Sequence, residues 1–341
     1  MLCAIIMAGG VGTRFWPQST EKKPKQFLKL LNDKTMIQMT YERINKVVDK
    51  DHIFIATNEK YTDLVKEQIE GINDKNIILE PSSKNTAPCI LLSSLYIKEL
   101  YGDANIVCIS SDNLVLDEKK FAEDIITADS FIKENKEAII TIGIKPNRPE
   151  TGYGYIKIND DSKSVIKVDK FVEKPDLDTA KKYLDDGNYL WNAGMFIFNN
   201  ISMLNELEKN MTNNYKLLST LPNYEYTDLL KSKYNECEKI SIDYAVMEKS
   251  NNVYTIKTDF GWDDVGTWKS LERYLNKDEN NNILKGDIEC IDSKNNIVYA
   301  NGKKIIIMDL DNIFCIDSDD VIVIGKKEDI SKVHELRKKS N

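Results

Sequence analysis

A glycine-rich turn near the start of the chain combines several residues that can hold phosphate. The apolar run 2–7 leads into Ala8, Gly9, Gly10, Gly12, Thr13 and Arg14, and Lys25 follows eleven residues later. Glycines let backbone N–H groups approach a ligand closely, and such turns can form anion-binding nests. Arg offers a planar fork of donors and Lys a mobile charge. The pattern predicts a nucleoside triphosphate held after the first strand of a parallel sheet.

Two common phosphate loops do not match this turn. A Walker A loop requires Gly-x-x-x-x-Gly-Lys-Ser/Thr, and no Lys-Ser/Thr pair follows the glycines. The dinucleotide fingerprint requires a third glycine three residues after the second, but counting from Gly10 and Gly12 that position is Phe15. For the glycine cluster alone, a strand-to-helix turn without a ligand remains the alternative.

Two loop aspartates have the chemistry of magnesium ligands. Magnesium prefers hard oxygen donors, usually one or two carboxylates together with phosphate oxygens and water. Asp112 follows an apolar run at 105–110, and Asp264 lies in the segment 260–268. Taken alone, each could equally cap a loop. Ligands bind open parallel sheets beyond the carboxyl ends of the strands, so Asp112 and the glycine turn are expected at one crevice.

Alternating strand and helix signals must position these residues. The sequence predicts strands at 2–7, 52–57, 76–79, 105–110 and 138–142, and helices at 36–48, 60–69, 87–100 and 119–135, with Thr86 capping the third helix. This alternation predicts a parallel sheet covered on both faces. From residue 153 the strands 153–158, 165–173 and 195–199 predict an antiparallel or mixed insertion. Helices are expected at 178–185, 201–221 and 243–248, and a strand at 253–257.

The predicted fold class is α/β, with two domains. Residues 1–280 are expected to form a Rossmann-like, mixed but mostly parallel sheet flanked by helices. Residues 281–341 are expected to form a small β-rich module that ends in a helix at about 330–338. Its short strands are expected at 297–299, 304–309, 313–316 and 321–324. A short left-handed β-helix is one form that the module could take.

Composition excludes several classes of partner. The 341 residues carry 47 basic and 55 acidic side chains, a net charge of −8, which argues against a nucleic acid polymer. No apolar stretch reaches the length of a membrane span, and no basic segment precedes the apolar start as in a signal peptide. The six cysteines lie far apart, as expected of free thiols in the cytoplasm. The two histidines lie outside the motifs, which argues against zinc or a histidine base.

Several separately spaced motifs resemble one enzyme family. Gly10-x-Gly12-Thr13-Arg14-x-x-Pro17 followed by Pro24-Lys25 resembles the signature of sugar nucleotidyltransferases, which join a nucleoside triphosphate to a sugar 1-phosphate. The segments 15–17 and 24–28 (Phe-Trp-Pro and Pro-Lys-Gln-Phe-Leu) are similar to the mannose-1-phosphate guanylyltransferase branch. The resemblance covers almost the whole chain, including 241–248 and 316–323, and implies the nucleotidyltransferase fold.

The resemblance also implies a role for each motif. It assigns the triphosphate and leaving group to Arg14 and Lys25, the sugar phosphate to Lys174, and Mg²⁺ to Asp112 and Asp264. It assigns the nucleotide to Ala8, Gly9, Gly10, Gly12, Thr13, Glu80, Asn85 and Thr86, and the sugar to Gly152, Glu173 and Asn192. Plainer interpretations remain: a solvated ion pair for Glu173 and Lys174, a helix cap for Asn85 and Thr86, and a hairpin turn at 151–156. Trp191 and Phe196 are expected in the core.

The family resemblance implies a reaction between GTP and mannose 1-phosphate. The sugar phosphate would attack the α-phosphorus in line, with Mg²⁺ as cofactor, giving GDP-mannose and pyrophosphate. The nucleophile is already an anion, so no general base is needed. By analogy, we expect a homodimer. A guanylyltransferase for another hexose or heptose 1-phosphate is one alternative, and a non-catalytic sugar-nucleotide-binding regulatory protein is another.

Three positions depart from the family pattern. Asn113 stands where the family usually has His, Ala193 where it has Ser, and Lys84 where it has Arg. Asn113 and Ala193 leave the choice of sugar open. We expect a short form, because little sequence follows the small module and the cupin-type phosphomannose isomerase domain of longer relatives would not fit.

Overall fold

The computed structural model describes residues 1–10, 12–160 and 162–336, so Val11 and the end of the helix expected at 330–338 lie outside it. The chain forms two compact units. The first contains residues 1–9 and 39–263, and the second contains residues 10–38 and the segment from 264 onward. The chain thus passes between the units within two of the predicted motifs, at Gly9–Gly10 and Asp263–Asp264. The domains expected at 1–280 and 281–341 stay a prediction from composition.

The first unit is built on a nine-stranded sheet in the order β3-β2-β1-β4-β9-β6-β10-β8-β7. Its strands are β1 (Leu2–Met7), β2 (Ile53–Asn58), β3 (Ile77–Glu80), β4 (Asn105–Ser110), β6 (Ile139–Ile144), β7 (Tyr155–Ile158), β8 (Ile166–Val172), β9 (Tyr189–Asn199) and β10 (Val253–Thr258). The first four are mutually parallel. Strand β9 is antiparallel to both β4 and β6, which confirms a mixed sheet.

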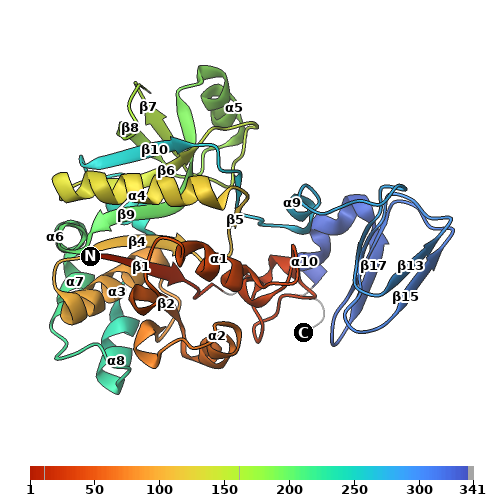
Figure 1. The fold of residues 1–341 in the computed structure, drawn as a ribbon, viewed down its shortest axis with the longest axis horizontal. Coiled ribbons are helices and arrows are strands. Elements are labelled where there is room, and N and C mark those ends of the chain that lie inside the picture. Colours follow the sequence, from red (N-terminus) through yellow and green to blue (C-terminus); the bar gives the residue numbers. More distant parts are fainter. Residues whose placement is uncertain (11, 161, 337–341) are drawn as a thin grey trace. The chain divides into compact units, whose positions relative to one another are not determined.

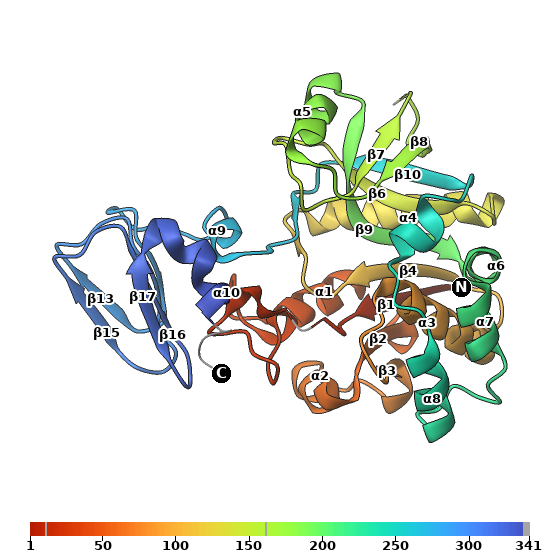
Figure 2. The ribbon, with the colours of Figure 1, turned by 180° about the vertical axis from the view of Figure 1, so that it is seen from behind.

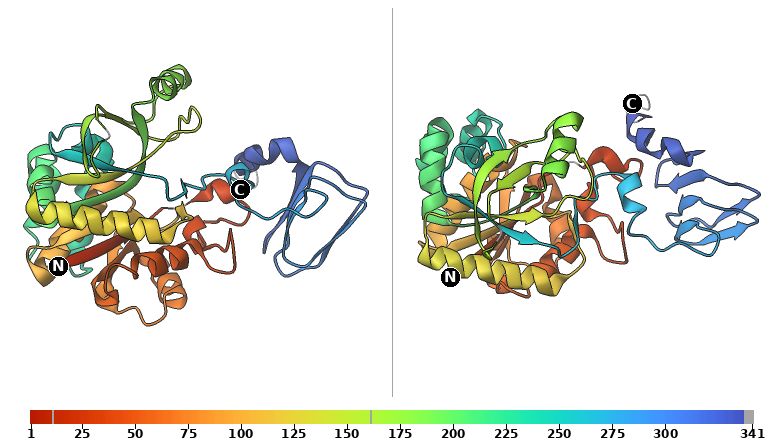
Figure 3. Two further views of the ribbon diagram at one scale, coloured as in Figure 1. Left: turned by 45° about the horizontal axis from the view of Figure 1, so that its top comes forward. Right: turned by 90° about the horizontal axis from the view of Figure 1, so that it is seen from above.

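Helices cover both faces of this sheet, as the continuous apolar strands require. They are α1 (Met36–Ile44), α2 (Thr62–Gln68), α3 (Thr86–Tyr101), α4 (Glu118–Glu134), α5 (Leu177–Asp186), α6 (Asn200–Asn210), α7 (Thr212–Ser219) and α8 (Asp228–Glu236). Helix α4 lies on one face, while α6 and α7 lie on the other (Figures 1 and 2). The view from above shows the strands between these two layers (Figure 3).

Several expected features of the first unit differ in the structure; the strand expected at 195–199, for example, begins six residues earlier, at Tyr189. The helix expected at 201–221 is two helices, because Met211 leaves the helical region at φ −136° and ψ 46°. The helix expected at 243–248 is a π-helix, η6 (Asp243–Met247). The N-cap of α3 is Asn85 rather than Thr86, so the predicted cap was wrong by one residue. Helix α8 and the short strands β5 (Leu114–Val115) and β11 (Trp262–Asp263) were not predicted.

The order of the strands creates a switch point between β1 and β4. The chain runs from β1 to β2 and β3 on one side and then returns to β4 on the other side of β1. The two strands are parallel, with Met7 opposite Ser110. Gly9 and Asp112 therefore follow neighbouring strand ends, where α/β sheets bind ligands. Gly9 and Asp112 thus lie at one edge of the sheet, while the crevice expected for Asp112 and the whole glycine turn stays a prediction.

Parallel β-coils form residues 283–326 of the second unit. Strands β12 (Ile283–Lys285), β14 (Ile297–Tyr299) and β16 (Ile313–Asp317) pair in parallel, and β17 (Ile322–Lys326) closes that sheet in antiparallel fashion. Strands β13 (Ile288–Ile291) and β15 (Ile305–Met308) form a second parallel pair (Figure 1). The unit also contains α9 (Trp268–Leu271), the 3-10 helix η7 (Lys327–Lys332) and α10 (Val333–Leu336). A β-rich module ending in a helix is thereby confirmed.

Stacked asparagines hold the corners of the coils. Asn281, Asn295 and Asn312 each adopt a positive φ, at 62°, 56° and 57°. Asn281 donates to Asn295 Oδ1 at 2.8 Å, and Asn295 donates in turn to Asn312. Asn tolerates the left-handed region better than most residues, so one residue type supplies both the turn and the ladder.

Candidate active site

A buried carboxylate lies at the carboxyl end of β3. Glu80 is 6% exposed, and the Tyr234 hydroxyl donates a hydrogen bond to its Oε1 at 2.6 Å. Burial raises the pKa of Glu80, while the hydrogen bonds from Tyr234 and Cys89 act in the opposite direction. A Cβ placed on Gly9 would lie 2.7 Å from Glu80 Oε2, so any larger residue there would displace the Glu80 carboxylate. The structure thus brings together two predicted nucleotide residues, Gly9 and Glu80.

Asn85 and Thr86 connect the start of α3 to a distant segment. Asn85 adopts a positive φ of 70° and its side chain accepts from Thr86 N at 2.8 Å, which is the capping role. The Thr86 hydroxyl instead accepts from Ile242 N at 2.8 Å. Thr86 therefore anchors the residue that precedes the π-helix η6. The nucleotide role of both residues stays a prediction beside these structural roles.

Asp112 lies in the loop between β4 and β5 and is partly exposed. The neighbouring Ser111 N donates to Met7 O at 3.1 Å, which ties the loop to the end of β1. Asn113 is buried, and its Oδ1 accepts from Trp262 Nε1 at 3.2 Å. The amide that replaces the family's usual His thus links this loop to β11.

The predicted sugar side contains an ion pair at the end of β8. Lys174 Nζ pairs with Glu173 Oε1, and Lys174 holds a positive φ of 35°, an uncommon backbone state that concentrates at functional sites. The Glu173 side chain is only 6% exposed. A Cβ on Gly154 would lie 2.6 Å from Glu173 Oε2. Gly154 is therefore the glycine packed on this pair, whereas the predicted Gly152 is exposed and donates to Glu150.

Asn192 on β9 is fixed by hydrogen bonds from three directions. Its Oδ1 accepts from Thr141 Oγ1 at 2.8 Å and from Gly194 N at 3.1 Å. Its Nδ2 donates to Asp243 Oδ1 at 3.1 Å. The backbone N–H of Asn192 donates to Gly154 O at 2.8 Å. Asn192 thus lies beside the Glu173 site. The neighbours Trp191 and Phe196 are each 2% exposed, which confirms their place in the core.

The second unit brings together Arg14 and Lys25, the cations predicted for the triphosphate, and the predicted metal ligand Asp264. Lys25 is 5% exposed, and its Nζ donates to Asp264 O at 2.6 Å. Gly12 has a positive φ of 48°, and a Cβ there would lie 2.7 Å from Lys25 Cβ. Asp264 Oδ1 accepts from Gly266 N at 3.0 Å. A Cβ on Gly266 would lie 2.8 Å from Asp264 Oδ2 and 3.2 Å from Arg14 Nη1.

These contacts explain why residues 12 and 266 of the second unit are glycines. Gly12 admits Lys25, and Gly266 admits Arg14 beside the Asp264 carboxylate. Gln26 Nε2 donates to Gly10 O at 2.9 Å, which fixes the loop, and Thr13 begins the 3-10 helix η1 (Thr13–Phe15). The remaining predicted nucleotide residue, Ala8, belongs to the first unit, where its N–H donates to Ala56 O at 2.7 Å.

Three residues of these sites were missing from the predicted set. Tyr234 comes from α8, and no local pattern connects it with Glu80, 154 residues earlier. Gly154 lies within the quoted motif 151–156, so the signal was present but the neighbouring Gly152 was chosen. Asp243 lies within the segment 241–248 that resembles the family, but the sequence predicted only that it begins a helix.

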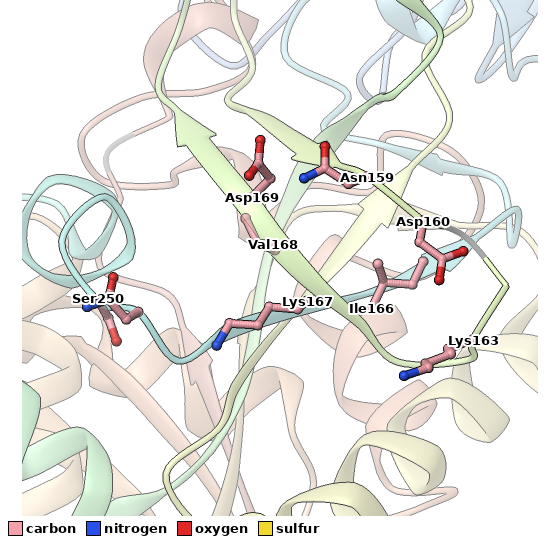
Figure 4. A pocket seen from close by; sticks show the side chains of 9 residues that line it. Asn159, Asp160, Lys163, Ile166, Lys167, Val168, Asp169 and Ser250 are labelled. Atoms are coloured by element: carbon pink, nitrogen blue, oxygen red, sulfur yellow. The ribbon is translucent and has the colours of Figure 1, made fainter.

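A surface pocket of about 550 Å³ lies elsewhere in the first unit. It is lined by Asn159, Asp160, Lys163, Ile166, Lys167, Val168, Asp169, Ser250 and Asn251. Figure 4 shows these polar and charged side chains around β8. None of the predicted site residues lines this pocket.

The described residues contain neither a group of three or more metal-ligating side chains nor a membrane-spanning helix. Across residues 1–10, 12–160 and 162–336, no group of three or more His, Cys, Asp or Glu side chains is arranged to hold a metal ion. Within the same ranges, no helix is long and apolar enough to cross a membrane.

Comparison with known proteins identifies the family. The sequence model described as "Nucleotidyl transferase" matches residues 3–281. The chain therefore belongs to the nucleotidyl transferase family and is an enzyme of that class. The fold agrees, because a crystal structure titled as a "mannose-1-phosphate geranyltransferase" from Thermus thermophilus matches with a TM-score of 0.89. That match has 30% identity and covers 99% of each chain.

The curated relatives point to one branch of this family. The chain is 34% identical to "Mannose-1-phosphate guanylyltransferase 2" of Escherichia coli O157:H7, covering 98% of this chain and 72% of the relative. It is 36% identical to "Mannose-1-phosphate guanylyltransferase" of Salmonella muenchen, covering 100% of this chain and 74% of the relative. The predicted resemblance to mannose-1-phosphate guanylyltransferases is confirmed.

Proposed function

We propose that the chain transfers GMP from GTP to mannose 1-phosphate, giving GDP-mannose and pyrophosphate. The observation that carries the choice of base is the buried Glu80 carboxylate at the end of β3. Guanine offers two adjacent donors, its ring N–H and its amino group, and a carboxylate accepts both. Adenine offers no such pair. Because a site built around buried polar groups rejects a ligand that leaves them unpaired, Glu80 favours GTP. The names of the curated relatives support mannose 1-phosphate.

Fixed cations supply the electrostatics of this reaction. The sugar phosphate and the triphosphate are both anions, and negative charge grows on the departing pyrophosphate. Arg14 and Lys25 are proposed to stabilise the triphosphate and the leaving group, and Lys174 the sugar phosphate. Such preorganised charges contribute most in sites that exclude water. The attacking oxygen belongs to a phosphate, so it carries charge without a general base.

Magnesium is the proposed cofactor. The predicted donors Asp112 and Asp264 are carboxylates, and Arg14 lies beside Asp264, as suits a centre that binds phosphate. Hard oxygen donors of this kind fit magnesium, which takes its other ligands from phosphate and water. When bound, the ion would neutralise phosphate charge.

Pyrophosphate release across a grid of nucleoside triphosphates and sugar 1-phosphates tests this proposal. We expect GTP with mannose 1-phosphate to give the highest kcat/KM. A higher value for another hexose or heptose 1-phosphate would overturn the sugar assignment. Tight binding of GDP-mannose with no release of pyrophosphate from any pair would contradict the proposed reaction and favour a binding protein.

Two neighbouring aspartates provide a matched pair of variants. Asp263 is 2% exposed, and its Oδ2 lies 3.8 Å from Arg148 Nη2, whereas Asp264 lies beside Arg14. We expect Asp264→Asn to lower kcat by at least about 10²-fold, as loss of one electrostatic group in an active site does. Asp263→Asn should mainly lower stability. Equal losses of turnover in the two folded variants would refute the assignment of Asp264.

We propose that the protein is a cytoplasmic homodimer. The six cysteines are free thiols, as is usual in a reducing compartment. Ile306 and Met308 on β15 are 57% and 61% exposed, and Ile322 and Ile324 on β17 are 46% and 65% exposed. Both strands lie at the edge of their sheets, and exposed apolar edges are usually covered. Light scattering should give a dimer that Ile324→Lys dissociates; a monomeric wild type would contradict the proposal.

A further inference from the structure

The predicted sugar-side residues converge on one aspartate that no comparison assigns. Asp243 accepts a hydrogen bond from Asn192 Nδ2. Its pKa is raised to about 6, first by burial and then by the negative charge of Glu173, while Lys174 and Ser241 act in the opposite direction. Asp243 therefore lies within electrostatic reach of both members of the Glu173–Lys174 pair. Three motif residues, Glu173, Lys174 and Asn192, share this one neighbour, which lies 51 residues beyond Asn192 in the sequence.

The amide of Asn192 shows why this neighbour matters. Both acceptor positions of its Oδ1 are taken, by Thr141 Oγ1 and Gly194 N. One of its two N–H groups goes to Asp243. Asn192 can therefore offer a substrate hydroxyl only its second N–H, and Thr141 and Asp243 together decide where that N–H points.

The backbone around Asp243 is built to hold the residue in place. Asp243 begins the π-helix η6, a rare form that occurs mostly as single turns at functional sites. The preceding Ile242 N–H is anchored on the Thr86 hydroxyl. At the other end of η6, Glu248 Oε1 accepts from Glu173 N at 3.3 Å. The segment 242–248 thus connects the start of α3 with Asn192 and with the end of β8.

We infer that Asp243 is a positioning residue of the sugar-phosphate end, acting through Asn192 and Lys174. Its carboxylate orients the Asn192 amide. Together with Glu173, Asp243 places two negative charges near the Lys174 ammonium. These charges hold the ammonium at the carboxyl end of β8 until a sugar phosphate replaces the carboxylates as its partner. This inference rests on the proposed function, because it takes the end of β8 as the sugar-phosphate side.

The charge of Asp243 makes the inference testable by pH. The titratable and charged groups that interact with it are Glu173 and Lys174 at the end of β8. Below pH 6 the carboxyl becomes protonated and its negative charge is lost. A sugar 1-phosphate has its own ionisation in this range, since second phosphate pKa values lie near 6. The informative quantity is therefore the difference between the pH profiles of the wild type and Asp243→Asn, because the substrate contributes equally to both.

Steady-state kinetics of Asp243→Asn test the inference. The amide keeps the size and an acceptor for Asn192 but removes the charge. With whichever sugar 1-phosphate supports turnover, we expect KM for that substrate to rise about 10-fold and KM for the nucleotide to change less than about 2-fold. We also expect a step near pH 6 in the difference between the wild-type and variant pH profiles, because only the wild type adds the ionisation of Asp243 to that of the substrate. The surface variant Asp178→Asn, on an 87% exposed side chain, is the control.

Thr141→Val provides a second, independent variant. It removes the hydrogen bond from the Thr141 hydroxyl to Asn192 and leaves Asp243 intact, so KM for the sugar phosphate should rise while the step near pH 6 remains.

Equal changes in both KM values, or an unchanged pH profile in Asp243→Asn, would overturn the inference. Failure of the wild type with every sugar 1-phosphate would instead refute the proposed function. In that case direct calorimetric binding of mannose 1-phosphate to the wild type and Asp243→Asn still tests Asp243, and equal affinities would overturn the inference.

Discussion

Carboxylates lie at two ends of the first unit, the carboxyl end of β3 and the carboxyl end of β8, and the two ends differ in the charge of the groups around them. At the end of β3, Glu80 is surrounded by neutral donors, the Tyr234 hydroxyl and the Cys89 thiol. At the end of β8, Glu173 is paired with the Lys174 ammonium, and Asp243 lies within reach of both. Burial is the largest cause that raises the pKa of Glu80 and of Asp243.

This difference matches the two ligands that the ends are proposed to bind. A base is neutral, so a single carboxylate held by neutral donors can accept its N–H groups without a counter-charge. A sugar phosphate is an anion, so its end needs a cation, and that cation must be held in place before the ligand arrives. Under the proposed function, carboxylates largely removed from solvent would serve hydrogen-bond recognition at the end of β3 and charge placement at the end of β8.

The largest effect should come from removing the cation of the sugar-phosphate end. Lys174→Gln would leave the carboxylates of Glu173 and Asp243 facing an incoming phosphate. We expect kcat/KM for the sugar phosphate to fall about 10³-fold, as for loss of a fixed charge at a transferring phosphoryl group, while KM for GTP stays within about 2-fold. Initial rates of pyrophosphate release measure both, with Lys181→Gln on α5 as the surface control. A matching loss for GTP would break the distinction between the two ends.

Glu80→Gln tests the end proposed to read the base. The amide replaces one carboxylate oxygen by a donor, which faces the donors of guanine. We expect kcat/KM for GTP to fall about 10²-fold, in line with roughly 1.5–3 kcal/mol for a hydrogen bond to a charged group, with little change in KM for the sugar phosphate. Competition between GTP and ATP provides the check. Undiminished preference for GTP would remove Glu80 from base recognition.

Tyr234→Phe should have a smaller effect at the same end. It deletes the hydroxyl that donates to Glu80 Oε1, and an unpaired buried acceptor costs about 1–3 kcal/mol. We expect KM for GTP to rise about 10-fold and the unfolding midpoint to fall, while KM for the sugar phosphate stays constant. Nucleotide titration and thermal unfolding of the same samples distinguish the two effects. A lower midpoint with an unchanged KM for GTP would leave Tyr234 with a structural role only.

The pH dependence of stability tests the charge at Asp243 without any substrate. The pKa of Asp243 is about 6 in the folded protein against an ordinary 3.8. A raised carboxyl pKa contributes stability that is present below pH 3.8 and lost as the pH rises through 6. Asp243→Asn lacks this loss, so relative to the wild type it should gain up to about 3 kcal/mol between about pH 4 and 8. Denaturant titrations at both pH values measure this difference, and a constant difference would contradict the burial of a charge at Asp243.

The order of elements could be predicted from the sequence because the strands of the first unit are continuous apolar runs. The strand expected at 105–110 is β4, and Asp112 follows it at the same edge as Gly9. Local spacing likewise predicted that Arg14 and Lys25 serve one phosphate-binding turn, because residue type and short-range spacing are displayed directly by a sequence. Asp264 lies 239 residues beyond Lys25 and was connected with them only by the family resemblance.

Contacts between distant side chains could not be predicted in the same way. Tyr234 meets Glu80 across 154 residues, and Asn192 meets Asp243 across 51. The sequence around a Tyr on a helix, or around an Asp at a helix start, does not indicate which distant residue it will contact. The π-helical turn at 243–247 was predicted as an α-helix because its apolar residues follow a helical pattern. The packing of Gly154 against Glu173 could not be predicted, because only the folded structure shows which glycine of the segment 151–156 faces Glu173, and the role of Gly152 stays a prediction.

The most direct test is to measure both KM values, for GTP and for mannose 1-phosphate, in the wild type, Glu80→Gln and Asp243→Asn. Pyrophosphate release with both substrates varied gives every value in one experiment. The predicted result is a crossed pattern, in which Glu80→Gln raises only the KM for GTP and Asp243→Asn raises only the KM for mannose 1-phosphate. If either variant raised both KM values equally, the two carboxylate sites would not serve separate substrates, and the assignment of the two ends would be wrong.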